Sequence, residues 1–158
     1  YILHFLGVMM LEIDINEIKS KKYKLFINYA FFNCNYFSFV IDKDNQFHNN
    51  LLELLKLNCP QDILNEKIVY VHPETGTNFD GGYMITLKCN AYSRALFLKV
   101  YCIEDFNGID FPEDLCFYKN GTVWFKFISH EKILLVLSED VRDIDFFKSN
   151  KIYYNYTI

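Results

Sequence analysis

Phenylalanine and tyrosine recur along this chain in short apolar runs that end at turn-forming residues. There are 16 phenylalanines and 12 tyrosines, as in Tyr29-Ala30-Phe31-Phe32 and Phe125-Lys126-Phe127. Aromatic and β-branched residues suit the pleated, half-buried surface of a strand. Strand-like runs outnumber helix-like ones, so we predict an α+β fold with a mostly antiparallel sheet and two or three helices.

The clearest local signal is a β-hairpin over residues 115–127. Asn120-Gly121 separates two aromatic runs, and this dipeptide tolerates the positive φ angles of a type I′ turn. Residues 133–137 fit either a strand or the core of a helix. Other segments have a strand-like pattern, and they are 11–16, 68–71, 83–89, 95–103, 152–158, and 23–41 as two strands that bend at residues 33–35.

Helix signals occur at two places. The leucine-rich stretch 51–57 follows a candidate cap at Asn49 or Asn50 and ends before Pro60. Ser138 is expected to cap a second helix over 141–147, with acidic residues in its first turn. Residues 72–82, rich in glycine, are expected to form a surface loop of about ten residues.

The length and composition indicate one globular domain over residues 1–158. The chain is 51% hydrophobic and 23% charged, which is ordinary for a folded protein and argues against disorder. The chain has five cysteines, which is an odd number, and no two of them form a C-x-x-C motif. We therefore expect reduced thiols in a cytoplasmic protein, with no metal site and no cofactor.

The charge balance excludes some classes of partner. The formal net charge is −4 with a pI near 5.5, and Arg94 and Arg142 are the only arginines. A dedicated nucleic-acid surface needs a basic stripe and arginine forks, so we expect no nucleic-acid partner. The apolar first eleven residues are shorter than the roughly 20 that a membrane span requires, so we expect no membrane association.

Two groups of residues are candidates for chemistry. His72, Glu74 and Asp80 flank the expected loop and would offer an acid and a base if they converged. Ser129-His130-Glu131 places a hydroxyl, an imidazole and a carboxylate side by side, but neighbours on a strand point to opposite faces. Neither group has a spacing diagnostic of a reaction, so we assign no catalytic residue.

Acidic residues gather in two segments and suggest a surface for a basic protein partner. One group lies in the expected loop 104–114 and the other at the start of the late helix, on either side of the aromatic hairpin. A patch of one sign speeds association with a partner of opposite charge, and aromatic residues supply anchor contacts. The candidate partner-binding residues are Glu104, Asp105, Asp110, Glu113, Asp114, Trp124, Glu139 and Asp140.

The chain resembles the bacterial immunity proteins of contact-dependent and polymorphic toxin systems. The resemblance rests on its small, acidic, aromatic-rich composition with lysine favoured over arginine, and on the stretches 110–114, 119–124 and 128–131. It implies a cytoplasmic protein that binds a cognate, nuclease-like toxin and blocks its active site. Such toxins are commonly basic, which agrees with an acidic binding surface.

Two other functions remain open from the sequence. A small enzyme would bring His72, Glu74 and Asp80, or His130 and Glu131, into one concave pocket with shifted pKa values. A structural subunit would instead associate with itself through an exposed aromatic strand edge.

Overall fold

The computed structural model describes residues 7–43, 46–109 and 111–157, with only the backbone described for residues 46–50. The strands are β1 (Met9–Ile13), β2 (Tyr36–Ile41), β3 (Ile63–Val71), β4 (Asn78–Lys88), β5 (Glu113–Lys119), β6 (Thr122–Ile128), β7 (Ile133–Ser138) and β8 (Tyr154–Thr157). The α-helices are α1 (Ser20–Asn33), α2 (Gln46–Asn58), α3 (Ala91–Phe97) and α4 (Val141–Ser149). Short 3-10 turns span Ile15–Glu17, Pro60–Asp62 and Ile103–Asp105.

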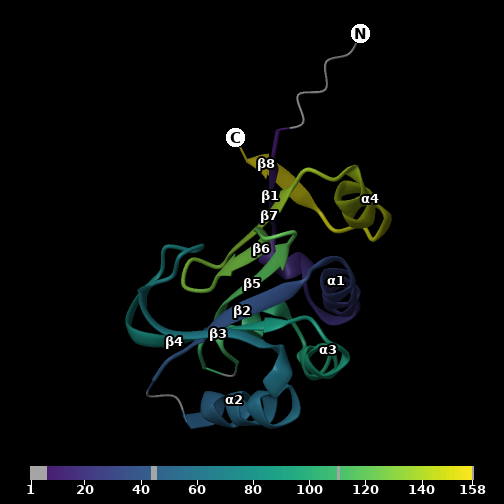
Figure 1. Cartoon of the computed structure of the whole chain (residues 1–158). Coiled ribbons are helices and arrows are strands. Elements are labelled where there is room, and N and C mark those ends of the chain that lie inside the picture. Colours follow the sequence, from purple (N-terminus) through teal and green to yellow (C-terminus); the bar gives the residue numbers. More distant parts are fainter. Residues whose placement is uncertain (1–6, 44–45, 110, 158) are drawn as a thin grey trace.

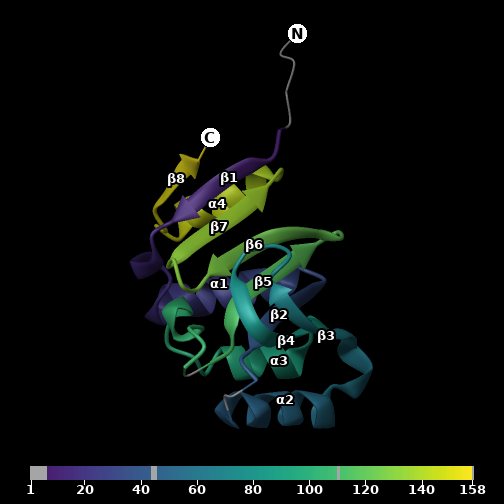
Figure 2. The same cartoon turned by 90° about the vertical axis from the view of Figure 1, so that its left-hand side faces the viewer.

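The eight described strands form one antiparallel sheet in the order β3-β4-β2-β5-β6-β7-β1-β8. In both views β8 and β1 lie at one end of the molecule, and β3 and β4 lie toward the other (Figures 1 and 2). This confirms the mostly antiparallel α+β architecture. The long strands β3 and β4 form one edge hairpin, and the short strand β8 closes the opposite edge.

One face of the sheet carries the aromatic core. Helices α1, α3 and α4 lie on one side of the strands, and α2 lies beyond them below β3 and β4 (Figure 1). All four helices contribute to the same buried cluster, for example through Phe26, Leu55, Phe97 and Phe147. Burying side chains of this size removes much apolar area from water, which is the main force that holds the helices to the sheet.

The hairpin predicted around Asn120-Gly121 is confirmed. β5 and β6 pair, and the two turn residues have φ angles of 52° and 82°. Glycine is needed for a different reason at Gly82 in β4, because a Cβ atom there would lie 2.6 Å from Val40 Cγ1. The missing side chain leaves room for the side chains of Val40 and Phe79.

The opposite face of the sheet is covered in part by the tip of the β3–β4 hairpin. The Thr75 hydroxyl donates to Asp114 at 2.5 Å, and Lys126 Nζ donates to the Glu74 carbonyl at 2.8 Å. Asp114 belongs to β5 and Lys126 belongs to β6, and both strands are distant from the hairpin in sequence. The hairpin therefore folds back over the sheet and closes this face at its tip.

Two predicted strands are helices, so the chain has four described α-helices where we expected two or three. Residues 20–33 form α1, whose buried residues Tyr23, Phe26, Ile27 and Ala30 follow the i, i+3, i+4, i+7 spacing of a helix face. Residues 91–97 form α3, which Asn90 caps by accepting from the Ser93 N–H at 2.8 Å. In both places helical packing against the sheet overrides the strand propensity of aromatic residues.

Other boundaries also differ from the prediction. The expected loop 72–82 is only a short turn, because β4 begins at residue 78 and continues the hairpin. The cap of α4 is Asp140, which accepts from the Arg142 N–H, and Ser138 ends β7 instead. Residues 133–138 form a strand, and α2 begins before the asparagines expected to cap it. No helix in the described ranges has the length and apolar character needed to cross a membrane.

Candidate functional site

Three residues expected on a partner-binding surface lie inside the protein. Glu113 and Asp114 keep 5% and 0% of their accessible area, and Trp124 keeps 2%. Glu113 and Asp114 begin β5, which lies between β2 and β6 in the middle of the sheet. Side chains buried this deeply cannot contact a partner, so these three do not form the surface that we predicted.

Asp114 is buried because it joins separate segments of the chain. Its carboxylate accepts the Thr75 hydroxyl at 2.5 Å and the Ser129 N–H at 3.0 Å. Its own N–H donates to the Ser129 hydroxyl oxygen at 2.8 Å, and that hydroxyl donates to the Phe106 carbonyl. The φ angle of 53° at Asp114 is a conformation that aspartate tolerates better than most residues. The residue is a structural junction.

Trp124 is buried because it binds α4 to the sheet. The indole N–H donates to the fully buried carboxylate of Asp143 at 2.9 Å. The Tyr29 hydroxyl donates to the same carboxylate at 2.6 Å, and the Ser138 hydroxyl is a third donor to it. A buried carboxylate needs such donors, so this cluster fixes α1, β6 and α4 relative to one another.

Two acidic residues of the predicted loop are exposed in part but already have partners. Asp105 accepts from the N–H groups of Tyr101 and Cys102, both at 3.3 Å, and so holds a 3-10 turn. Glu104 forms an ion pair with Lys132 at 2.7 Å. The Glu104 charge is therefore balanced by Lys132, and the Asp105 carboxylate is bound to backbone N–H groups within the chain.

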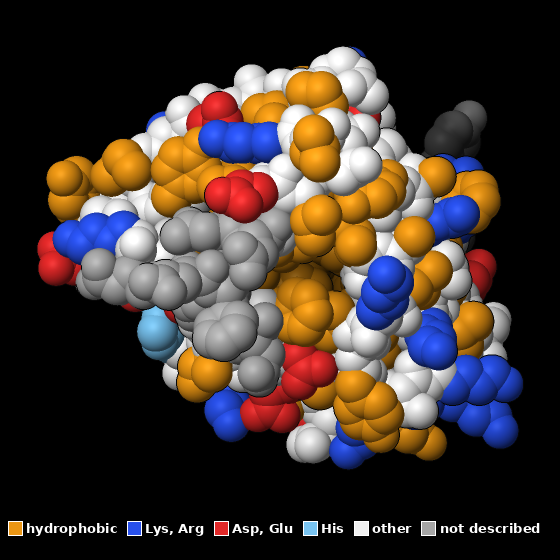
Figure 3. Space-filling model, turned by 90° about the horizontal axis from the view of Figure 1, so that it is seen from below, with side chains coloured by type: hydrophobic (Ala, Val, Ile, Leu, Met, Phe, Trp, Pro, Cys, Tyr) orange, Lys and Arg blue, Asp and Glu red, His pale blue; other side chains and the backbone are white. Residues whose placement is uncertain are grey.

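One of the two acidic residues at the start of α4 is also neutralised. Asp140 lies 2.6 Å from Arg142 and 3.3 Å from Lys119, and hydrogen bonds from Arg142 hold the pKa of Asp140 well below its usual range. Glu139 is exposed, and Asp110 lies outside the described residues. On the face seen from the α2 side, acidic side chains occur in separate small groups among lysines and hydrophobic side chains (Figure 3).

A different surface is exposed at the edge strand β3. Four of its apolar side chains are exposed, namely Leu64 (48%), Ile68 (54%), Tyr70 (67%) and Val71 (55%). β3 pairs with β4 on one side and is the last strand of the sheet on the other. Long edge strands with exposed apolar side chains are templates for pairing with another chain. We call residues 63–71 the β3 edge.

The helix next to the β3 edge holds it in place without covering it. Lys56 of α2 forms an ion pair with Glu66 at 2.7 Å, and the Tyr83 hydroxyl donates to Glu66 at 2.6 Å. Exposed Leu54 and Leu57 of α2 add apolar surface at the same end of the molecule. Glu66 is therefore paired, whereas Lys67, which follows it in β3, is exposed and has no ion pair among the described residues.

The residues proposed for acid–base chemistry near the hairpin tip do not converge. His72 is buried, and its Nδ1 accepts from the N–H groups of Glu74 and Thr75 at 3.1 and 3.2 Å. Burial lowers the pKa of His72 to about 4, so the imidazole is neutral near pH 7. Asp80 is fully exposed and lies 3.8 Å from Lys43. His72 is a turn-stabilising residue, and Asp80 is solvated.

His130 and Glu131, in contrast, lie at one hollow. The hollow has a volume of about 330 Å³ and is lined by residues 75–78, Ile128, His130 and Glu131. His130 Nε2 lies 2.8 Å from Glu113 Oε2. Burial raises the pKa of Glu113 to about 6, opposed by the positive charge of His130 and reinforced by Asp114 and Asp42. The imidazole of His130 lines the hollow, and the Glu113 carboxyl group contacts it from a buried position.

The hollow lacks an activated nucleophile among the residues that the structure describes. The Ser129 hydroxyl is buried and donates to a backbone carbonyl, and Cys116 is fully buried with a pKa raised well above that of a free thiol. Within the described ranges no three His, Cys, Asp or Glu residues are placed to hold a metal ion. The contact between His130 and Glu113 is of a kind suited to proton transfer.

No protein-family model, no curated protein and no solved structure matches the chain. The surfaces and the hollow described above therefore carry the functional argument. The sequence pattern missed the β3 edge, since residues 68–71 resemble a buried strand. The polar stretch Asn65-Glu66-Lys67 immediately before them was the one available signal that this strand is exposed.

Proposed function

We propose that this chain is a protein-binding module that pairs a segment of its partner with the β3 edge, and that within this class it is an immunity protein. In this role it neutralises a cognate, basic, nuclease-like toxin in the bacterial cytoplasm by direct binding. The toxin class comes from the resemblance of the sequence to immunity proteins. The binding mode comes from the β3 edge.

The exposure of the β3 edge is the observation that carries this proposal. An added strand would satisfy the outward backbone N–H and C=O groups, and the exposed side chains would give that pairing specificity. Ile68 lies near the middle of the exposed stretch, where anchor contacts contribute most to binding, and Tyr70 lies next to its end. The net charge of −4 favours encounter with a basic partner over the whole surface.

The test compares the wild-type chain with the double variant Ile68→Lys/Tyr70→Lys. Tagged forms are used to capture partners from the source organism, and complexes are measured by native mass spectrometry. We expect the wild type to hold one basic protein in a one-to-one complex and the double variant to lose it. Tyr156→Lys on the opposite edge strand β8 is the matched control, since Tyr156 is also exposed, and it should retain the partner.

A growth assay then separates protein binding from immunity. Expressed alone, the captured protein should arrest growth, and coexpression of the wild-type chain should restore it. A captured protein that the double variant holds as tightly as the wild type would remove the β3 edge from the proposal. A partner without effect on growth would contradict the immunity role. If the wild type formed homo-oligomers and the double variant were monomeric, the β3 edge would be a self-association surface.

Acid–base catalysis at the hollow is a second candidate function. The observation that favours it is the 2.8 Å contact between His130 and Glu113 beside a concave space. An enzyme of this kind should turn over small ester, phosphate or glycoside substrates, and His130→Gln or Glu113→Gln should remove most of that activity. His130→Gln activity equal to the wild type would exclude the hollow as the reacting centre.

A further inference from the structure

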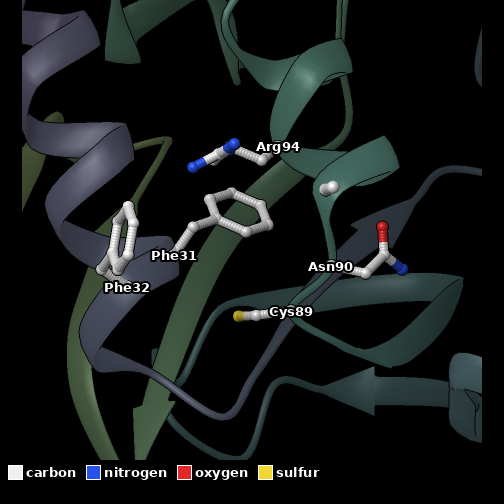
Figure 4. Close-up of a pocket in the computed structure, with 6 residues that line it drawn as sticks. Phe31, Phe32, Cys89, Asn90 and Arg94 are labelled. Carbon is white, nitrogen blue, oxygen red and sulfur yellow. The ribbon is translucent and has the colours of Figure 1, made fainter.

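A pocket between α1 and α3 combines an apolar floor with a cationic rim. It has a volume of about 230 Å³ and is lined by Phe31, Phe32, Cys89, Asn90, Ala91 and Arg94. Arg94 reaches over the pocket from α3, and Phe31 and Phe32 enter it from α1 (Figure 4). No lining residue belongs to the β3 edge or to the hollow beside His130, so this is a separate site.

The floor of the pocket is held rigidly by the core. The Phe31 ring lies 5.5, 5.4 and 5.3 Å from the rings of Phe37, Phe97 and Phe117. Burial raises the pKa of the Cys89 thiol to about 12, so this side chain is neutral and adds apolar surface. A ligand would therefore meet a preformed surface and would lose little affinity to rearrangement of the protein.

Arg94 has a charge that the described part of the protein leaves unpaired. Its guanidinium lies 5.7 Å from the centre of the Phe32 ring, and no hydrogen bond or ion pair of its side chain occurs among the described residues. The other arginine, Arg142, differs because it binds the Asp140 carboxylate at 2.6 Å. An arginine fork matches a carboxylate in geometry, so Arg94 is ready to accept one.

The Phe32 ring and the Arg94 guanidinium are both available to a ligand. Phe32 is 80% exposed, so its face would gain from contact with an apolar ligand. The Asn90 side chain is already used, since it accepts from the Ser93 N–H at 2.8 Å and donates to Asp62 at 3.1 Å. Figure 4 shows Asn90 turned away from the two rings. Polar selectivity at this pocket therefore rests on Arg94.

We propose that this pocket binds a carboxylate carried by an aromatic group, with the carboxylate on Arg94 and the ring against Phe31 and Phe32. The volume suits such a ligand, because a cavity of about 150 Å³ already admits benzene and this pocket has about 230 Å³. Two sources share this chemistry. One is a free arylalkyl acid, and the other is the C-terminal phenylalanine of a peptide.

The test is an NMR titration of the ¹⁵N-labelled protein with 3-phenylpropionate and with its neutral match, 3-phenylpropanamide. We expect the acid to shift the backbone amide signals of residues 31, 32 and 89–94, and the amide to bind about tenfold more weakly or not at all, since it offers no charge to Arg94. Equal binding of the acid and the amide would overturn the proposal, as would acid-induced shifts confined to other parts of the chain.

Variants assign the effect to named groups. Arg94→Gln should weaken the acid about tenfold, and Arg94→Lys, which keeps the charge without the fork, should give a smaller loss. Phe32→Ala tests the ring contact and should also weaken binding. Arg142→Gln is the matched control and should leave the affinity unchanged. A loss for Arg142→Gln as large as that for Arg94→Gln would contradict a specific site.

A pair of peptides identifies the source of the carboxylate. Acetyl-Gly-Gly-Phe with a free C-terminus is compared with its C-terminal amide and with 3-phenylpropionate. Tighter binding of the free peptide than of 3-phenylpropionate assigns the pocket to peptide C-termini. Tighter binding of the small acid assigns it to free arylalkyl acids. Peptide acid and peptide amide of equal affinity would overturn the carboxylate assignment.

Discussion

The two faces of the sheet are built from different chemistry. On the helix-covered face, Phe37 and Phe39 of β2 alternate into the aromatic core. On the other face, Ser38 of the same strand contacts the Tyr118 hydroxyl at 3.1 Å, and the hairpin tip buries His72 and Asp114 nearby in the fold. One face is held mainly by apolar contact, and the other combines directed hydrogen bonds with a small apolar cluster of Val40, Val69, Met84 and Phe79.

The two faces should therefore differ in how much they contribute to the free energy of folding and in how strongly that contribution depends on pH. Apolar burial is insensitive to pH and non-directional, so the helix-covered face should supply most of the folding free energy. Buried groups with shifted pKa values make folding depend on pH, and His72 on the hairpin-covered side is one of them. The hollow beside His130 lies at the margin of the hairpin tip, and the β3 edge is the last strand of the sheet. These two candidate functions therefore lie away from the aromatic core, whereas the pocket between α1 and α3 rests on it.

The largest effect is expected from cutting into the aromatic face. Phe97 of α3 is buried among the rings of Phe31, Phe37, Phe106 and Phe117. Phe97→Ala should lower the free energy of unfolding by about 3–5 kcal/mol, measured by urea denaturation, because it leaves a cavity that rigid neighbours cannot fill.

Phe32→Ala is the control for this measurement, because Phe32 is exposed on a neighbouring helix. Its effect should stay within about 0.5 kcal/mol. Similar losses for the two variants would show that the helix-covered face does not supply stability in the way proposed.

The hairpin-covered face should respond to acid through His72. Burial lowers the pKa of His72 from 6.5 to about 4, so the folded state favours the neutral imidazole. The resulting stability is fully present above pH 6.5 and is lost as pH falls toward 4, with a total of about 3 kcal/mol from the shift.

His72→Asn tests this pH dependence. Asparagine offers an acceptor near the position of Nδ1 but does not titrate, so the variant should lose less stability between pH 6.5 and 4 than the wild type. Urea denaturation at several pH values measures the difference. Parallel pH profiles for the two proteins would show that His72 does not carry the acid response.

Glu113 should act in the opposite direction and with a smaller amplitude. Burial raises its pKa from 4.5 to about 6. The folded state therefore favours the protonated carboxyl, and this stability is present below pH 4.5 and lost as pH rises through 6. The total is about 2 kcal/mol.

Glu113→Gln keeps the shape of the protonated carboxyl without its titration. Relative to the wild type, the variant should gain stability as pH rises from 4.5 to 7. Double substitution with His72→Asn separates the two opposed contributions. If the difference in the free energy of unfolding between the wild type and Glu113→Gln were the same at every pH in this range, Glu113 would not be the group responsible for this pH dependence.

The parts of the fold that were predictable are those set by local sequence. Asn120-Gly121 specifies its turn within four residues, and the leucines of α2 repeat with a helical period. α1 was misread because Tyr29, Phe31 and Phe32 favour strands locally, while the buried face of the helix became clear only against the sheet. Packing between distant segments decided the structure there.

The candidate sites were predictable to a smaller degree, since they depend on strand order. The burial of Asp114 follows from a hairpin whose tip, at Thr75, is 39 residues away in sequence. Likewise, residues 68–71 look buried until β3 is known to be the last strand. The pair His130 and Glu131 was recognised as a group, but the contact of His130 with Glu113 joins the turn between β6 and β7 to the start of β5.

The smallest effect on stability is expected at the β3 edge, the last strand of the sheet. Ile68 is exposed, while its neighbour Val69 points to the opposite face and is buried with Val40 and Met84. Ile68→Lys should change the free energy of unfolding by less than about 0.5 kcal/mol, whereas Val69→Ala should cost about 1–2 kcal/mol. Urea denaturation of the two variants measures both values.

Self-association provides the second half of this comparison. A lysine on an edge strand discourages pairing with another chain, so Ile68→Lys should weaken any concentration-dependent association seen by analytical ultracentrifugation. Val69→Ala should leave that association unchanged, because its side chain does not reach the surface. If Ile68→Lys instead destabilised the fold as much as Val69→Ala, Ile68 would be part of the core, and the β3 edge would lose its central anchor as a binding surface.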